Sequence, residues 1–378
     1  MSVATHEAGR GVEATGRSRA VHHILPSLHV ADASGSHTLQ ARDALRDAGI
    51  ASEVFAEHVD EPLRTEAHPL DALDAFVVPG ATILVYQLAV GSAVVDGLLR
   101  RAEPLVVNYH NLTPASFFWQ WAPDWLEAVE WGRQQLHRLA PRTEHAVAVS
   151  AFNERDLRAA GYRSTSVVPP FVDVAGFGPP ARHGRARART GAHWLFVGKL
   201  LPHKAAHDLV KALAAYRRAY DPGATLALVG GHPVPAYAAA VADFAASLGL
   251  AGAVELTGAV SHDELAARYR AADVFVCLSD HEGFCFPLLE AMHHAVAVVA
   301  LDAGAVADTL GCAGVVLRDK DPARVATAVH RVMVDDRLHA AVVAAGRARL
   351  GAFDRRRTAA RYVAEIERVA ARCLVRVP

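Results

Sequence analysis

Two glutamates separated by seven residues stand in the second half of the chain, in the stretch "HEGFCFPLLEAM" at residues 281–292. Glu282 precedes the expected start of a helix, where Pro287 suits the first turn, and Glu290 lies about one turn into that helix. Carboxylates placed in this way can accept hydrogen bonds from two polyols, such as a ribose diol and a hexose. The alternative is an acidic residue that stabilises a helix dipole, which explains one glutamate but not the whole loop.

A second candidate site is a loop with two lysines, in "LFVGKLLPHKAAHDLVKAL" at residues 195–213. A strand is followed by Gly198, Lys199 and Lys204, and then by a helix. The glycine lets the backbone approach a ligand, and two ammonium groups near a helix N-terminus suit a diphosphate. The Walker A pattern is absent, and two lysines on a loop are also typical of a solvated surface.

The first half of the chain offers two further candidates. Gly35 lies in "LPSLHVADASGSHTLQ", where it either begins a helix or contacts a phosphate or an acceptor. His110 follows a strand, in "NYHNLTP". The dinucleotide fingerprint G-x-G-x-x-G is absent, which disfavours a nicotinamide or flavin enzyme.

The elements that must position these residues alternate between short apolar strands and longer helices, as in parallel α/β sheets. This alternation runs twice, so we expect two doubly wound domains. In such folds ligands bind at the carboxyl ends of the strands, and two facing domains would bring those ends to one cleft. The expected strands are 21–25, 52–57, 81–88, 104–110 and 144–150 in the first half, and 193–200, 225–231, 253–259, 273–279, 296–301 and 314–318 in the second.

The breaks in this pattern predict the domain boundaries. A stretch rich in Pro, Gly and Arg interrupts the alternation and indicates an interdomain linker. The C-terminal tail is helical throughout, and in a two-domain fold it can cross back to the first domain. The expected segments are a disordered leader at 1–20, a first domain at 21–172, a linker at 173–192, a second domain at 193–350 and a C-terminal helix at 351–378.

Composition narrows the class of protein. The chain has 378 residues, 52% of them hydrophobic and 21% charged, with a formal net charge of -1, so no global basic field exists to hold nucleic acid. Neither a signal peptide nor an apolar run of membrane-spanning length is evident, which favours the cytoplasm. The four cysteines form no CxxC pair, so we expect buried thiols in a reducing compartment rather than a zinc site. The Ala-, Arg- and His-rich composition is typical of a high-GC bacterium.

The segment "EGFCFPLLEAM" resembles the glutamate–seven residues–glutamate motif of the family 4 retaining glycosyltransferases, the glycosyl transferases group 1. "VGKLLPHK" resembles the phosphate loop of the same family. "DASGSH" and "YHNLTP" occupy the places of its first-domain glycine loop and its sugar-contacting histidine. The resemblance extends from about residue 21 to the end of the chain. It implies the GT-B fold, in which two Rossmann-like domains face a cleft.

The resemblance also implies roles in binding a nucleotide sugar. Lys199 and Lys204 would hold the donor diphosphate and neutralise it as it leaves, with Gly198 beside them. Glu282 would contact the hydroxyls of the donor sugar, and Glu290 those of the ribose. The backbone of Gly283, Phe284 and Cys285 would line the sugar and the phosphate, His110 would contact the transferred sugar, and Gly35 would approach the phosphate or the acceptor.

Two departures from the family pattern affect the backbone near these motifs. The family usually has Gly-Val-Pro-Val after the second glutamate motif, whereas this chain has Ala295 and Ala297 in the glycine and proline places. The lysine loop often continues with glycine, and here Ala205 follows Lys204. These alanines put the backbone path in question, but not the chemistry.

The implied activity is a retaining transfer of a sugar from a UDP- or GDP-linked donor to a hydroxyl of a small polar, natural-product or cell-envelope acceptor. The catalytic set is His110, Lys199, Lys204 and Glu282, with no metal and no cofactor beyond the donor. The alternatives are an epimerase or hydrolase of the same fold, and an inert nucleotide-sugar binding protein. Asp32 lies near the glycine loop without a sign that it serves as an inverting base.

The Trp-rich stretch at 119–131 is either a helix that buries its aromatic residues, or a wall for an acceptor or a lipid.

Overall fold

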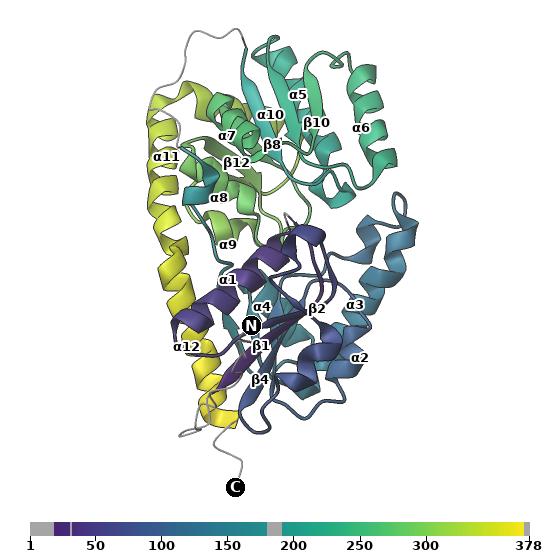
Figure 1. The fold of residues 1–378 in the computed structure, drawn as a ribbon. Coiled ribbons are helices and arrows are strands. Elements are labelled where there is room, and N and C mark those ends of the chain that lie inside the picture. The colour runs from purple at the N-terminus through teal and green to yellow at the C-terminus, as the bar shows by residue number, and fades with distance from the viewer. Residues whose placement is uncertain (1–18, 31, 180–190, 374–378) are drawn as a thin grey trace, which may run out of the picture.

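The computed structural model of the protein describes residues 19–30, 32–179 and 191–373. Figure 1 shows two α/β domains, one above the other, each built on a single parallel sheet. The expected leader lies outside the described residues up to residue 18, and the first strand begins at Ala20. Residues 180–190 of the expected linker and 374–378 of the tail also lie outside the described part.

The described part of the first domain holds a seven-stranded sheet in the order β3-β2-β1-β4-β5-β6-β7. Two of these strands, β3 and β7, have only two and three residues, too few to show a periodic pattern, and the sequence did not predict them. The strands are β1 (Ala20–Leu28), β2 (Val54–Val59), β3 (His68–Pro69), β4 (Thr82–Leu88), β5 (Leu105–Tyr109), β6 (Thr143–Ala148) and β7 (Thr165–Val167). The helices are α1 (Ala33–Asp47), α2 (Val94–Leu98), α3 (Leu126–Leu139) and α4 (Ala151–Ala159).

The described part of the second domain holds a six-stranded sheet in the order β10-β9-β8-β11-β12-β13. Its strands are β8 (His193–Val197), β9 (Thr225–Val229), β10 (Val254–Gly258), β11 (Val274–Cys277), β12 (Ala297–Leu301) and β13 (Val315–Leu317). Its helices are α5 (Ala206–Ala219), α6 (Pro235–Ser247), α7 (His262–Ala271), α8 (Phe286–His293), α9 (Val306–Leu310), α10 (Pro322–Val334) and α11 (Asp336–Leu350). Short 3₁₀ turns are η1 (Glu61–Leu63), η2 (Leu70–Ala75), η3 (Ala115–Phe117), η4 (Pro123–Trp125), η5 (Ala140–Arg142), η6 (Ala175–Phe177), η7 (Pro202–Lys204) and η8 (Gly351–Phe353).

The central strands explain why both sheets are parallel and covered by helices. β4, β11 and β12 are buried along their whole length and consist mainly of apolar residues, as expected for strands packed on both faces. The strand order of each sheet reverses once, between β1 and β4 and between β8 and β11. In doubly wound folds the crevice at such a reversal is the usual ligand site, and the loops after these strands carry the candidate residues.

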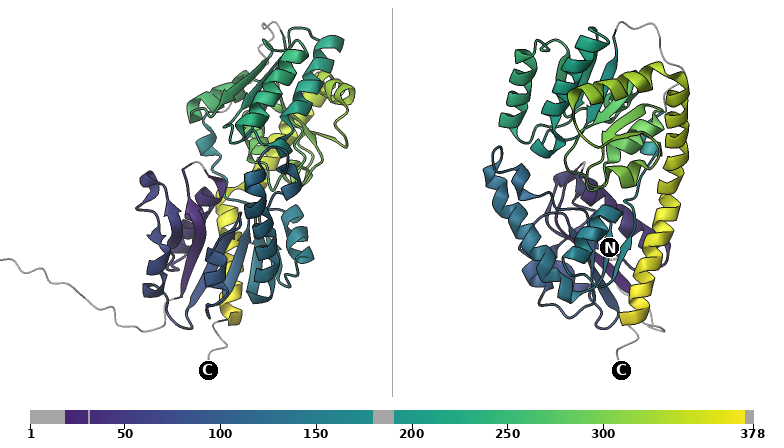
Figure 2. Two further views of the ribbon diagram at one scale, coloured as in Figure 1. Left: turned by 90° about the vertical axis from the view of Figure 1, so that its right-hand side faces the viewer. Right: turned by 180° about the vertical axis from the view of Figure 1, so that it is seen from behind.

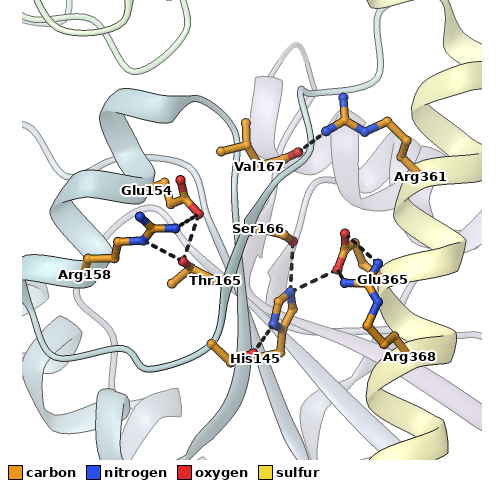
Figure 3. A network of polar contacts seen from close by, with 10 residues as sticks. His145, Glu154, Arg158, Thr165, Ser166, Val167, Arg361, Glu365 and Arg368 are labelled. Atoms are coloured by element: carbon orange, nitrogen blue, oxygen red, sulfur yellow. Dashed lines mark hydrogen bonds and ion pairs between the residues drawn. The ribbon is translucent and has the colours of Figure 1, made fainter.

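The last helix, α12 (Arg355–Cys373), returns to the first domain, and both views in Figure 2 show it running along that domain. Tyr362, Ile366 and Val369 are fully buried in a core cluster that also contains Val21 and Val85 of the first sheet. The polar contacts of the same helix appear in Figure 3. There Arg361 donates to the carbonyl of Val167 at 2.7 Å, and Glu365 lies 3.4 Å from His145.

Candidate active site

A cavity of about 510 Å³ opens where the carboxyl ends of the two sheets meet. This volume lies within the usual range for small-molecule sites. Most of its first-domain lining follows β1, β4 and β5, and much of its second-domain lining follows β8 and β11. Of the residues expected in the site, His110, Gly198, Lys199, Lys204, Glu282, Gly283, Phe284 and Cys285 line this cavity.

The lysine loop brings two ammonium groups to the cavity. Lys199 directly follows Gly198 at the end of β8 and is exposed. Lys204 ends the short turn η7, and Ala205 after it adopts a left-handed backbone with φ of 52°. This conformation favours glycine, the residue that the family often has at this place. The alanine therefore keeps the backbone path that the motif requires, at the cost of local strain.

Lys204 forms an ion pair with Glu282, the first glutamate of the motif. Its Nζ lies 2.7 Å and 2.8 Å from the two carboxylate oxygens. Burial lowers the pKa of Lys204, but Glu282 together with Cys285 and Cys277 more than offsets this effect, so the pKa lies above its ordinary value. The pair therefore keeps a fixed positive charge beside a carboxylate that can still accept hydrogen bonds.

Two glycines allow the glutamate loop to pack tightly. A Cβ on Gly283 would lie 2.6 Å from the Cβ of Asn111 and 3.0 Å from the carbonyl oxygen of His110, both from the first domain. A Cβ on Gly304 would lie 2.3 Å from the carbonyl oxygen of Glu282. These distances are too short for any side chain, so glycine is required at both positions: Gly283 at the boundary between the domains, and Gly304 against Glu282 within the second domain.

A chain of amide and imidazole side chains joins the domains at this point. His281 donates from Nε2 to the amide oxygen of Asn111 at 2.6 Å, and Asn111 donates to Asn153 at 2.8 Å. Asn153 then donates to the carbonyl of Gly283 at 3.3 Å. Asn111 has φ of 104°, a strained value that its contacts across the domain boundary maintain.

A buried polar network holds His110 from behind. The side-chain oxygen of Gln87 accepts from Asn108 at 2.8 Å and lies 2.7 Å from Nε2 of His110. The two hydrogens of the Asn108 amide go to Gln87 and to Nε2 of His37, which is 2.7 Å away. Gln87, Asn108 and His37 are at most 2% exposed.

This network determines which ring nitrogen of His110 carries hydrogen. Because the Gln87 oxygen can only accept, Nε2 of His110 must donate. Burial lowers the pKa of His110 to about 4, against a smaller raising effect of Asp32, so the ring is neutral at pH 7. Nδ1 has no hydrogen-bond partner among the described residues and is not buried. It therefore presents a lone pair to the cavity, suited to accept a hydrogen bond from a hydroxyl.

Two expected residues are not brought to the cavity. Gly35 lies in the first turn of α1, where its N–H donates to the carboxylate of Asp32 at 2.9 Å, while Asp32 and Ser34 line the cavity instead. Glu290 lies one turn into α8 as expected, but in a small neighbouring pocket with Phe177 and His262. The hydroxyl of Tyr269 donates to Glu290 at 2.6 Å. The ribose contact of Glu290 stays a prediction.

The Trp-rich stretch is not one helix, because Pro123 starts a separate turn, η4, before α3 begins at Leu126. Its aromatic residues separate into three environments. Trp119 is 67% exposed, whereas Trp125 lines the cavity and is 36% exposed. Trp121 contacts Tyr237 of the second domain, with ring centroids 5.4 Å apart. Part of the stretch therefore forms a cavity wall.

The cysteines meet the expectation of buried thiols only in part. Cys277 and Cys285 are buried with their sulfurs 4.0 Å apart, but Cys312 is exposed. Cys277, Glu282 and Cys285 place one donor atom each within 4.8 Å of one another, the kind of grouping that can hold a metal ion. Glu282 already has Lys204 as its counter-charge.

Contributors to the site that escaped the sequence analysis include His37, Gln87, Asn108, Asn153, His203 and His281. Gln87 and Asn108 carried a usable signal, since each is a polar residue inside an otherwise apolar strand. The others lie in stretches where polar residues are ordinary.

The second domain is similar in sequence to a known protein family. Residues 191–335 match the family described as Glycosyl transferases group 1. Over 231 residues the chain is 34% identical to the GDP-mannose-dependent alpha-(1-6)-phosphatidylinositol monomannoside mannosyltransferase of Mycobacterium tuberculosis. That alignment covers 57% of this chain and 59% of the relative, so it spans less than two thirds of the relative's length.

A longer match and a solved structure extend the likeness over both domains. The D-inositol 3-phosphate glycosyltransferase of Thermobispora bispora is 28% identical over 403 aligned positions, covering 89% of this chain and 91% of the relative. The structure of sucrose-phosphate synthase from Thermosynechococcus elongatus has a TM-score of 0.73 at 18% identity, covering 93% of this chain and 100% of that one. The expected GT-B fold is confirmed.

In the described part of the chain, no helix is both long enough and apolar enough to cross a membrane.

Proposed function

We propose that this chain, which belongs to the group 1 glycosyltransferases of GT-B fold, transfers a sugar from a nucleotide-diphosphate donor to an acceptor hydroxyl, with retention of configuration and without a metal ion. The observation that carries the proposal is the Lys204–Glu282 ion pair beside Lys199 in the interdomain cavity. Two cations suit a diphosphate, and the adjacent carboxylate suits the hydroxyls of its sugar.

The transfer needs charge stabilisation and positioning more than acid–base groups. The bond from the anomeric carbon to the phosphate oxygen breaks, and Lys199 and Lys204 neutralise the diphosphate as it leaves. The acceptor hydroxyl forms the new bond on the same face, and its proton passes to the departing phosphate oxygen. Glu282 and Nδ1 of His110 accept hydrogen bonds from the sugar, and the products are a glycoside and a nucleoside diphosphate.

The relatives support a choice of donor. One is named for its dependence on GDP-mannose, so we expect a GDP-linked hexose, with a UDP-linked hexose as the second candidate. Glu290 on α8, in the small pocket next to the cavity, is the residue that we expect to bind the ribose. For this contact Tyr269 must share the carboxylate with the ribose, since its hydroxyl bonds only one of the two oxygens in the structure.

The test is product analysis with GDP-α-mannose and UDP-α-glucose in the presence of a chelator. We expect acceptor-dependent release of the nucleoside diphosphate and an α-glycoside, identified from its anomeric coupling by NMR. A β-glycoside would overturn retention. Release that is independent of acceptor would indicate a hydrolase, and loss of activity in chelator would contradict a metal-free mechanism.

A further inference from the structure

We infer that the first-domain half of the cavity binds an acceptor that is uncharged, carries a hydroxyl group and has an apolar ring or chain, and that it excludes phosphorylated acceptors. This inference rests on the proposed function, because it assigns the donor to the second domain and the acceptor to the first. It depends on the charges, the helix terminus and the apolar side chains that face this half.

The positive charges of the cavity all come from one side. Its lysines, Lys199 and Lys204, both belong to the second domain, where the donor diphosphate needs them. Among the described residues, no lysine or arginine of the first domain lines the cavity. The charged residue of that half is Asp32, a carboxylate. A phosphate bound there would meet a like charge and would lack the cationic partners that phosphates usually have.

The helix terminus in this half is already occupied. The N-terminus of a helix after the first strand of a doubly wound domain is a ready site for an anion. Here Asp32 caps α1, accepting from the N–H of Gly35 at 2.9 Å and from the hydroxyl of Ser34. The carboxylate of Asp32 thus occupies the helix N-terminus that an acceptor phosphate would need. Because Asp32 belongs to the protein itself, a ligand cannot displace it by competition.

The remaining surface of this half is apolar with a few hydroxyl-binding groups. Trp125 and Val90 line it with exposed fractions of 36% and 39%, and Val129 lies beside them in the lining. Large exposed apolar side chains in a concave site favour an apolar part of the ligand. The hydroxyls of Ser34 and Thr113 also line this half and can form hydrogen bonds with an acceptor hydroxyl.

This acceptor class differs from the acceptors in the names of two relatives. Those names refer to phosphatidylinositol monomannoside and D-inositol 3-phosphate, both of which carry a phosphate. The shared second domain and donor site do not require a shared acceptor, because the acceptor half is built by the first domain.

The experiment compares two probes that differ only in a phosphate, phenyl β-glucoside and its 6-phosphate. Binding to the full-length protein with GDP present is followed by tryptophan fluorescence, with Trp125→Phe as the control that the signal comes from the cavity. We expect the phosphorylated probe to bind at least about tenfold more weakly. We expect Asp32→Asn to reduce this difference in affinity between the two probes. We expect Val90→Arg to reverse the difference, because the arginine adds the missing cation.

Equal or tighter binding of the phosphorylated probe by the wild type would overturn the inference. So would failure of phenyl β-glucoside to bind at up to about 10 mM, well above the weak affinities that this assay resolves. The proposed function fails separately: in that case GDP and UDP would leave the thermal midpoint of the same protein unchanged. If GDP stabilises the protein but the phosphorylated probe binds as tightly as phenyl β-glucoside or more tightly, the donor site is still supported and the inferred class of acceptor is wrong.

Discussion

The ammonium of Lys204 lies 2.7 Å and 2.8 Å from the two carboxylate oxygens of Glu282, across 78 residues of sequence. The side chains are 18% and 7% exposed, so water solvates neither charge well. Each charge is tolerated because the other is present. We therefore expect this ion pair to stabilise the fold in addition to its proposed role in binding the donor, and variants can separate these two effects.

Glu282→Gln should destabilise the fold and abolish most transfer. It leaves the buried ammonium of Lys204 without a counter-charge, which we expect to cost about 2–4 kcal/mol in the free energy of unfolding, measured in urea. The double variant Glu282→Gln with Lys204→Met should regain most of this stability while kcat stays low. Wild-type stability in the single variant would show that the pair contributes nothing.

Lys199→Ala should weaken nucleotide binding without affecting stability, because Lys199 is exposed. Loss of one charge-assisted hydrogen bond predicts an increase of about tenfold or more in the Kd for GDP, measured by calorimetry in chelator. Lys211→Ala is the matched control, since Lys211 pairs with Asp208 on α5 outside the cavity lining. An equal increase of the Kd for GDP in the two variants would show that Lys199 has no specific role in binding the phosphates.

Gln87→Met should reduce the selectivity of the enzyme for one sugar hydroxyl. Without the Gln87 oxygen, the tautomer of His110 is no longer set and Nδ1 can lose its lone pair. We expect kcat/KM to fall about tenfold for the intact donor sugar but little for the donor deoxygenated at the contacted position. Gln135→Met, at a buried glutamine that bonds the Ser92 backbone, should affect both donors by the same factor. The same uniform loss in Gln87→Met would contradict a role in positioning His110.

Ala295→Gly should stabilise the protein by about 0.5–1 kcal/mol, and Ala205→Gly by less, because Ala205 is fully buried and the change also removes a buried methyl group. Both alanines have left-handed backbones, with φ of 57° and 52°. Relief of that strain exceeds the extra entropy that glycine gives to the unfolded chain. Ala291→Gly, inside α8, is the control and should cost at least about 1 kcal/mol. Destabilisation by all three variants in thermal and urea unfolding would count against strain at these sites.

Mild acid should destabilise the fold through its buried histidines. Burial lowers the pKa of His23 to about 3, of His203 to about 2 and of His281 to about 4. As pH falls below 6.5 the unfolded chain takes up protons at these rings and the folded chain does not, so stability falls by on the order of 1.4 kcal/mol per ring and pH unit. The loss should begin near pH 6.5 and continue toward the folded pKa values, with little change between pH 7 and 8.

Urea unfolding as a function of pH measures this loss. In His23→Gln, the dependence of the free energy of unfolding on pH should become shallower, by the amount that corresponds to about one proton fewer taken up on unfolding. It should stay unchanged in the control His137→Gln, because His137 lies on an exposed position of α3. A free energy of unfolding that is flat down to pH 5 would contradict the prediction.

The sequence by itself determined the two doubly wound domains and indicated most of the candidate residues that lie at the cavity. Strand and helix periods are local properties, and Lys199, Lys204 and Glu282 follow strands whose carboxyl ends must share an edge of a parallel sheet. The positions of Gly198, Gly283, Phe284 and Cys285 follow from the same loops. These predictions required no knowledge of contacts between distant segments.

The tertiary structure decided which side chains meet. That Glu282 pairs with Lys204, that Gln87 orients His110, and that Asp32 rather than Gly35 faces the cavity all depend on segments far apart in the chain. The position of Glu290 beside Tyr269 is of the same kind, because a residue's turn on a helix does not say what packs against it. Local spacing limits where a residue can lie, whereas its partners and its charge state come from the packing of the whole fold.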